Sequence, residues 1–177
     1  MIAAFTKSAQ LPFSGWLTDC MTAPTPTSSL LHSAAMVIAG IFLLLRFRSL
    51  FFHSIGAIST ALTTVLGIAA ITKHDLKKII AFSTISQLGM MCLSCGLSNY
   101  SGAIFQVFTH AFFKALLFLT AATVIHSVNE QNIIKLGGLT RSLPLNSILH
   151  LGSSMSLIGM PFYAGFYSKD FILEFNA

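Results

Sequence analysis

The sequence predicts an all-α membrane protein, a polytopic bundle of transmembrane helices in which two helices are broken. Apolar residues make up 54% of the 177 residues and charged residues only 8%. About a quarter of the residues of an ordinary soluble domain carry a charge, so this chain has too little charge to cover a surface that faces water. Long apolar runs also recur along the chain, at close to the roughly 20 residues that cross a bilayer. The mean hydropathy of +0.79 agrees with both observations.

Taken in chain order, residues 1–23 are predicted to form the first broken helix. This segment begins apolar, meets Pro12, continues through Trp16, and is followed by a turn at residues 24–26 that holds two prolines. Proline removes a backbone donor and stops a helix in its interior. Four uninterrupted helices are expected next, at about residues 29–45, 54–72, 79–97 and 103–126.

Residues 145–177 are the second predicted broken helix, because Gly159, Pro161 and Gly165 interrupt the apolar run. Irregular backbone at membrane depth is tolerated only where protein or a water-filled cavity covers it. A pair of broken helices is typical of ion transporters. Both ends of the chain are expected to need further polypeptide, since neither the stretch before Lys7 nor the one after Asp170 is long enough to cross a membrane.

The charges in the links indicate an orientation. Residues 73–78 and 127–144 hold five Lys or Arg, whereas the opposite side holds Arg46, Arg48 and Lys169. By the positive-inside rule, the first side is expected to face the matrix or cytoplasm. The basic residues are scattered, unlike the concentrated basic face of a nucleic-acid binder. We therefore expect membrane lipids, and no nucleic acid, around this chain.

Several kinds of chemistry are not expected. The sequence has no Gly-rich phosphate loop, no paired carboxylates and no HExxH motif. Cys92 and Cys95 lie one helical turn apart in an apolar run without a second pair, so they are interpreted as packing residues. We expect no metal and no cofactor in this chain.

The strongest candidate site lies near the middle of the run at residues 103–126. Lys114 stands there, at a depth where a charge costs at least ~2.5–3.5 kcal/mol on insertion scales. His110 is four residues earlier and Gln106 another four, so all three share one helix face. A lysine and a histidine so placed can pass a proton. The alternative is that Lys114 extends to the membrane surface and His110 lines a structural polar pocket; the central depth favours function.

Other ionisable residues lie beside the breaks or at helix starts. Lys7 precedes the first break, and Lys169 with Asp170 follows the second. A charge beside a broken helix can meet water and exposed carbonyl groups, which makes these residues candidates for an ion path. A salt bridge between Lys169 and Asp170 explains that pair equally well, and His32 is equally well explained as an interfacial histidine. The remaining histidines are expected to be structural or solvated: His53, His74, His126 and His150.

Several blocks of the sequence resemble the chain 5 family of mitochondrial NADH–ubiquinone oxidoreductase. They are FTKSAQ at 5–10, PF at 12–13, WL at 16–17, APTP at 23–26, LLHS at 30–33, DLKKIIAFSTISQLG at 75–89, THAFFKA at 109–115, GMPF at 159–162 and GFYSKD at 165–170. The resemblance runs over essentially the whole chain, with the blocks in order. Members of that family are antiporter-like, with two broken helices and a line of charged and polar residues along the membrane midplane.

The resemblance implies that the chain is the central part of a proton-translocating membrane-arm subunit. Carried over by position, it implies a relay of protons through bound water, and the relay residues would be Lys7, His32, His110, Lys114, Lys169 and Asp170. It also implies the mitochondrial inner membrane, and an enzyme, H⁺-translocating NADH:ubiquinone reductase, whose NADH, FMN, iron–sulfur clusters and ubiquinone are bound by other subunits.

Family members are several times longer, so this chain is not expected to conduct protons alone. The implied partners are the other membrane-arm subunits and separate chains that carry the missing N- and C-terminal helices. Two alternatives stay open. One is a subunit of a bacterial cation/proton antiporter; the other is a non-conducting structural membrane fragment, in which Lys114 is dispensable.

Overall fold

The computed structural model describes residues 2–48 and 63–175. Its elements are α1 (Ile2–Lys7), α2 (Gly15–Asp19), η1 (Cys20–Thr22), α3 (Thr25–Leu30), η2 (Leu31–Ala35), α4 (Met36–Arg46), η4 (Leu66–Thr72), α6 (Leu76–Gly96), α7 (Tyr100–Val128), η5 (Ile133–Lys135), α8 (Leu139–Ser142), α9 (Pro144–Ile158) and α10 (Ala164–Phe175). The described residues form helices and connecting turns without a β-strand, so the predicted all-α bundle is confirmed.

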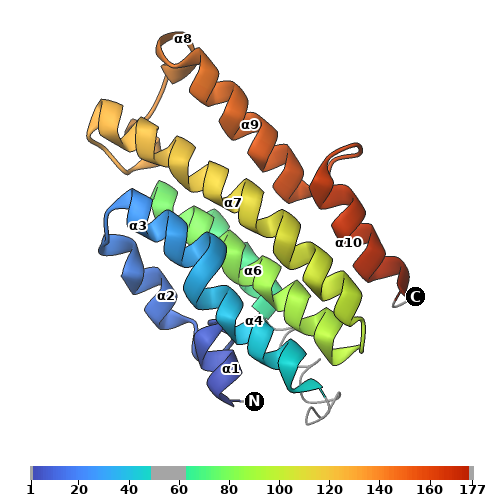
Figure 1. Ribbon diagram of the computed structural model, residues 1–177. Coiled ribbons are helices and arrows are strands. Elements are labelled where there is room, and N and C mark those ends of the chain that lie inside the picture. Colours follow the sequence, from blue (N-terminus) through green and yellow to red (C-terminus); the bar gives the residue numbers. More distant parts are fainter. Residues whose placement is uncertain (1, 49–62, 176–177) are drawn as a thin grey trace.

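The central element is α7, which packs against α3, η2, α6, α9 and α10. The long helices lie side by side as rods, with α1 and α2 at one edge and α9 and α10 at the other (Figure 1). The 21 residues of α6 and the 29 of α7 extend about 31 and 43 Å at 1.5 Å per residue. Both helices are long enough and apolar enough to cross a membrane.

The helices run slightly further than the apolar runs that predict them. The helix expected at 29–45 is continuous through α3, η2 and α4, from Thr25 to Arg46. The starts of α6 and α7 each precede the predicted start by three residues, because charged or polar residues occupy their first turns. Of the helix predicted at 54–72, residues 54–62 lie outside the described residues, as does His53, and Thr63–Thr72 is a short apolar helix.

At the first predicted break, α1 ends at Lys7 and α2 begins at Gly15. The chain between them turns, and Trp16 Nε1 donates a hydrogen bond to the carbonyl of Thr6 (2.9 Å). This contact ties the second helical segment to the first.

At the second predicted break, α9 ends before Gly159, which has φ +88°, a conformation that favours glycine. A Cβ atom at Gly165 would overlap the carbonyl oxygen of Ser156, so the first turn of α10 lies directly against the last turn of α9. Lys169 of α10 donates hydrogen bonds to the carbonyls of Leu157 and Ile158. The two halves are therefore held together by close contact and by a lysine on the free carbonyls of α9.

The two basic links lie side by side at one end of the bundle. The Leu76 amide donates to the Gln131 carbonyl (3.0 Å), and the Ile133 amide donates to the His74 carbonyl (2.8 Å). Asp75 and Asn132 form an isolated bridge at the same place. The prediction that residues 73–78 and 127–144 share one side is confirmed, and the basic residues of both links gather there.

Candidate functional site: a buried lysine, two histidines and an amide pair

Lys114 is fully enclosed by the helices, with 0% of the residue exposed. Its Nζ donates hydrogen bonds to Ser83 Oγ (2.6 Å) and to the Ile80 carbonyl (3.2 Å), both on α6. An ammonium group has three donors, so α6 occupies two of them. The alternative, in which Lys114 extends to the membrane surface, requires an exposed side chain. The Lys114 side chain does not reach the surface of the described chain.

A second polar pair joins the same two helices one step further along. Gln106 Nε2 of α7 donates to Gln87 Oε1 of α6 (3.0 Å), and both residues are buried. Ser83 and Gln87 are four residues apart on α6, so they share one face. Together α6 and α7 present matching polar rows, with Ser83 opposite Lys114 and Gln87 opposite Gln106.

His110 lies between these two pairs on α7 and is also 0% exposed. Among the described residues, neither of its ring nitrogens has a hydrogen-bond partner. Its ring packs edge-on against Phe113, with the centroids 5.4 Å apart. Since a buried polar atom without a partner costs about 1–3 kcal/mol, water is the ordinary partner at such a site. A neutral imidazole accepts at one nitrogen and donates at the other, so His110 is equipped to pass a proton.

His32 approaches this group from a different helix. It is 1% exposed and lies in η2, a π-helical turn within the α3–α4 helix; such turns are frequent at functional sites. Its ring centroid is 5.3 Å from that of Phe118 on α7, and Nδ1 has no partner among the described residues. His32 lies within electrostatic range of Lys114, and His110 within range of Lys114, His32 and Lys169.

The other predicted residues occupy the edges. Lys169 is half-buried at the end of α9 and within electrostatic range of Lys114. Asp170 is half-buried too. Lys169 and Asp170 do not form a salt bridge, since the two ion pairs of the described chain are Lys78–Asp75 (3.0 Å) and Lys135–Glu130 (2.9 Å). Lys169 instead donates to carbonyl groups of α9. Lys7 is exposed at the end of α1, apart from the central group. The relay roles of all six residues stay predictions.

Sequence reasoning missed a second buried lysine. Lys77 is 5% exposed, and its Nζ donates to the Ala23 carbonyl at 3.1 Å. It also lines a pocket of about 600 Å³, together with Pro24, Thr25, Pro26, Ala122, Thr123, Ile125, His126, Asn129 and Gln131. The predicted helix began at residue 79, which left Lys77 in a link. Asp75, a residue type that favours the position before a helix, was the signal for an earlier start.

Fold and site together define an integral membrane protein whose helices enclose a row of amide and ionisable side chains. The chain belongs to the family described as "NADH:quinone oxidoreductase/Mrp antiporter, TM", which matches residues 1–177.

Curated relatives resemble the chain over nearly its whole length. NADH-ubiquinone oxidoreductase chain 5 of Triticum aestivum is 50% identical, over 98% of this chain and 27% of the relative. Chain 5 of Pongo abelii is 48% identical, over 98% of this chain and 30% of the relative. The chain thus spans less than a third of the length of these relatives.

Solved structures share the fold at lower identity. A chain of the Mrp complex from Dietzia sp. has a TM-score of 0.91 at 24% identity, over 98% of this chain and 34% of its own length. A chain of the membrane-bound sulfane sulfur reductase, an archaeal respiratory membrane complex, has a TM-score of 0.90 at 23% identity, over 97% and 38%. The arrangement of helices is therefore that of a membrane domain found in these complexes.

Proposed function

We propose that this chain is part of a proton-translocating membrane-arm subunit of NADH:ubiquinone oxidoreductase in the mitochondrial inner membrane. The observation that carries the proposal is the fully buried Lys114, which donates to Ser83 and Ile80 of α6. On the same helix His110 has two ring nitrogens without a hydrogen-bond partner among the described residues. A buried lysine in a membrane helix is costly and marks an ion or proton path by default. Electron transfer and its cofactors belong to other subunits of the complex.

The central residues have complementary roles in this proposal. Lys114 binds a proton in the protein interior and releases it when the charges around it change. His110 and His32 pass protons through bound water, because each has a ring nitrogen that no described residue occupies. Lys169 interacts electrostatically with Lys114, because α10 packs against α7.

The pocket beside Lys77 supplies this row with a polar opening. Thr25 lines it, and Ser28, Ser29 and His32 follow at helical spacing along the same face of the α3–η2 helix, which packs on α7. Ser28 and Ser29 are buried. In this proposal, protons enter from the basic end of the bundle and reach His32 along this face.

The relatives favour this proposal over a cation/proton antiporter subunit. Identity is 48–50% with the chain 5 relatives and 24% with the chain of the Mrp complex. A non-conducting fragment remains the competing proposal, and the two differ in what they require of Lys114.

The test is Lys114→Ala in the assembled complex, reconstituted into proteoliposomes. We expect the number of protons moved per electron to fall, while electron transfer from NADH to a water-soluble acceptor is kept. Lys73→Ala is the matched control, because Lys73 is an exposed lysine of the link before α6.

The amount of assembled complex is measured for both variants, so that a failure to assemble is recognised. A Lys114→Ala complex that assembles and pumps with unchanged stoichiometry refutes the relay. In that case the chain is a structural part of the membrane arm.

A further inference from the structure

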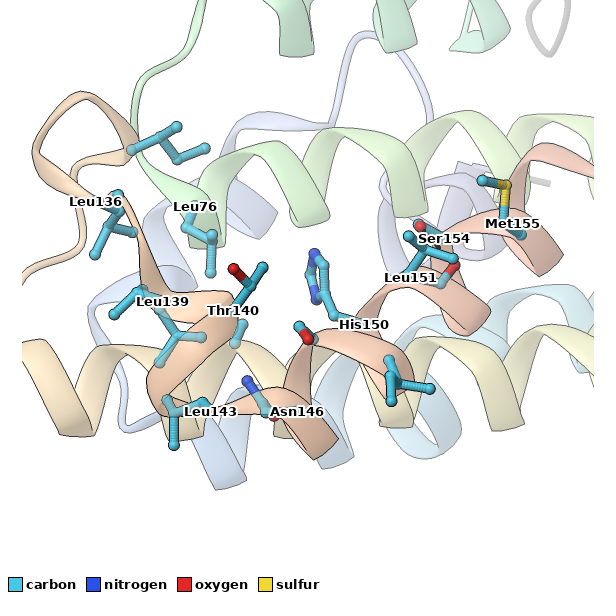
Figure 2. Close-up of a pocket in the computed structure, with 16 residues that line it drawn as sticks. Leu76, Leu136, Leu139, Thr140, Leu143, Asn146, His150, Leu151, Ser154 and Met155 are labelled. Carbon is cyan, nitrogen blue, oxygen red and sulfur yellow. Dashed lines mark hydrogen bonds between the residues drawn. The ribbon is translucent and has the colours of Figure 1, made fainter.

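Two pockets of the described chain that lie away from Lys77 differ in the polarity of their walls. The larger, about 640 Å³ between α7, α8 and α9, is lined mostly by aliphatic side chains, with His150 among them (Figure 2). His150 Nδ1 is 3.0 Å from Thr120 Oγ1, so this ring is engaged in the contact between α9 and α7. The smaller pocket, about 340 Å³, lies against α6 and has polar side chains in its wall. We call it the α6 pocket.

The α6 pocket offers hydrogen-bond partners to water. Its lining is Thr64, Gly67, Ile68, Ile71, Ser83, Ser86, Gln87 and Leu157. Ser86 Oγ donates to the Thr64 carbonyl (3.3 Å), and Gln87 Oε1 accepts from Gln106 (3.0 Å). A hydroxyl oxygen also accepts, and an amide nitrogen carries two donors. One water takes up roughly 30 Å³ of liquid volume, so the pocket has room for several waters.

Ser83 stands between the α6 pocket and the buried lysine. It is half-buried and lines the pocket, whereas Lys114 is 0% exposed. Ser83 Oγ accepts from Lys114 Nζ (2.6 Å) and donates to the Ile80 carbonyl (2.8 Å). Lys114 Nζ donates to the same carbonyl (3.2 Å). Of these two acceptors in the described part of the chain, only the hydroxyl can both take up and give away a proton, since a carbonyl group has none to give.

We infer that Ser83 is a relay residue, through which Lys114 exchanges its proton with water in the α6 pocket. The inference rests on the proposed function, and it gives Lys114 a contact with water that is distinct from the pocket beside Lys77. No residue is common to the linings of the two pockets.

The transfer proceeds in two steps. The Ser83 hydroxyl first turns from the Ile80 carbonyl to a water in the pocket, and that carbonyl keeps Lys114 as a donor. One Nζ–H bond of Lys114 then breaks as a new Oγ–H bond forms on Ser83, while the original Oγ–H bond breaks and its proton joins the water. Lys114 is left as a neutral amine, and the protonated water passes the proton on. Uptake of a proton by Lys114 uses the same bonds in reverse.

The competing role for Ser83 is that of an anchor, which only holds the ammonium group of Lys114 in place. An anchor requires an acceptor atom and no water. Without the Ser83 hydroxyl, the Ile80 carbonyl would still hold Lys114. An anchor therefore predicts lower stability with unchanged pumping, whereas a relay predicts loss of pumping.

The experiment compares Ser83→Val with Ser83→Thr in the assembled complex, reconstituted into proteoliposomes. The two new side chains have nearly the same shape and differ in the hydroxyl group, and valine fills the space that a replacement water would need. Ser83→Val should lower the number of protons moved per electron as far as Lys114→Ala does. Ser83→Thr should keep the value of the unmodified complex.

A second pair of variants tests the pocket without changing either partner of the relay. Ser86 lines the pocket, and its hydroxyl bonds Thr64 rather than Lys114. Ser86→Ala removes that hydroxyl and should leave pumping unchanged. Ser86→Leu removes it too, but also fills the pocket, and should lower the protons moved per electron. If Ser86→Leu does not assemble, Ile68→Trp fills the pocket from its exposed wall. The amount of assembled complex and the thermal inactivation midpoint are measured for every variant.

The outcomes separate this inference from the proposed function. Unchanged pumping in Ser83→Val, with pumping lost in Lys114→Ala, removes Ser83 from the relay and leaves the proposed function standing. Unchanged pumping in Lys114→Ala overturns both. Equal losses in Ser83→Val and Ser83→Thr show that the size of the side chain matters and not its hydroxyl, which overturns the inference. Unchanged pumping with the pocket filled shows that Ser83 is only an anchor.

Discussion

Replacing His110 by leucine tests whether this histidine relays protons or only fills space in the bundle. The residue is fully buried, and both ring nitrogens lack a partner among the described residues. Leucine has a similar size and keeps the contact with Phe113, so the substitution removes the two nitrogens and little else.

The expected change in stability depends on whether water occupies the site around His110. If the site is dry, two unpartnered polar atoms cost about 1–3 kcal/mol each. His110→Leu then stabilises the protein by about 2–6 kcal/mol and leaves pumping intact. If water bridges the nitrogens, the substitution strands that water instead. Stability is then unchanged or reduced by about 1–3 kcal/mol, and pumping is lost. We expect the second outcome.

The assay measures the thermal inactivation midpoint of the assembled complex and the protons moved per electron in proteoliposomes. His74→Leu is the control, since His74 is an exposed histidine in a link. A clear rise in the inactivation midpoint of His110→Leu, with full pumping, would refute the role of His110 in the relay.

Two further substitutions test how the bundle is held together. Gly165→Ala should reduce stability by about 1–3 kcal/mol or more and lower the thermal inactivation midpoint, because the new Cβ overlaps the Ser156 carbonyl. Gly152→Ala is the control, since no atom lies within 4 Å of its Cβ, and it should leave the midpoint unchanged. Equal effects of the two substitutions would contradict the close contact. Lys77→Met should reduce stability by about 1.5–3 kcal/mol, the value of a hydrogen bond to a charged group. Lys78→Met is the control, because it removes an exposed ion pair worth about 0–1 kcal/mol. The same midpoint is measured, and a decrease for Lys77→Met no larger than that for Lys78→Met would show that Lys77 does not hold Ala23.

The centre of the site could be predicted from the sequence because its signal is local. Lys114, His110 and Gln106 recur at helical spacing within one apolar run, and a charge at that depth needs an explanation. The apolar runs predicted the bundle for the same reason. The start of the helix predicted at residues 79–97 was harder to predict. Lys77 lies before that range, and its ammonium group is satisfied by carbonyl groups of a segment more than fifty residues away.

What escaped prediction depends on contacts between distant segments. The sequence left an ion path and a salt bridge equally open for Lys169 and Asp170. In the structure, the close approach at Gly165 brings Lys169 to the end of α9, where carbonyl groups accept its hydrogen bonds. His150 was expected to be structural or solvated, and its contact with Thr120 of α7 is structural; no local pattern indicated that partner. Neither the pairing of α7 with α9 nor the π-helical turn that holds His32 has a local signature in the residues concerned.

The burial of the candidate residues divides them into two groups that need different tests. His32, His110 and Lys114 are enclosed by helices of this chain itself. Their environment is therefore already defined, and substitutions there report on the row directly. Lys7 is exposed at the end of α1, at the edge of the bundle opposite α10 (Figure 1). A charge that stays in contact with water carries none of the cost that marks Lys114 as functional. A relay role for Lys7 therefore requires a partner surface that buries it, and until such a surface is found, the case for proton transfer depends on the three central residues.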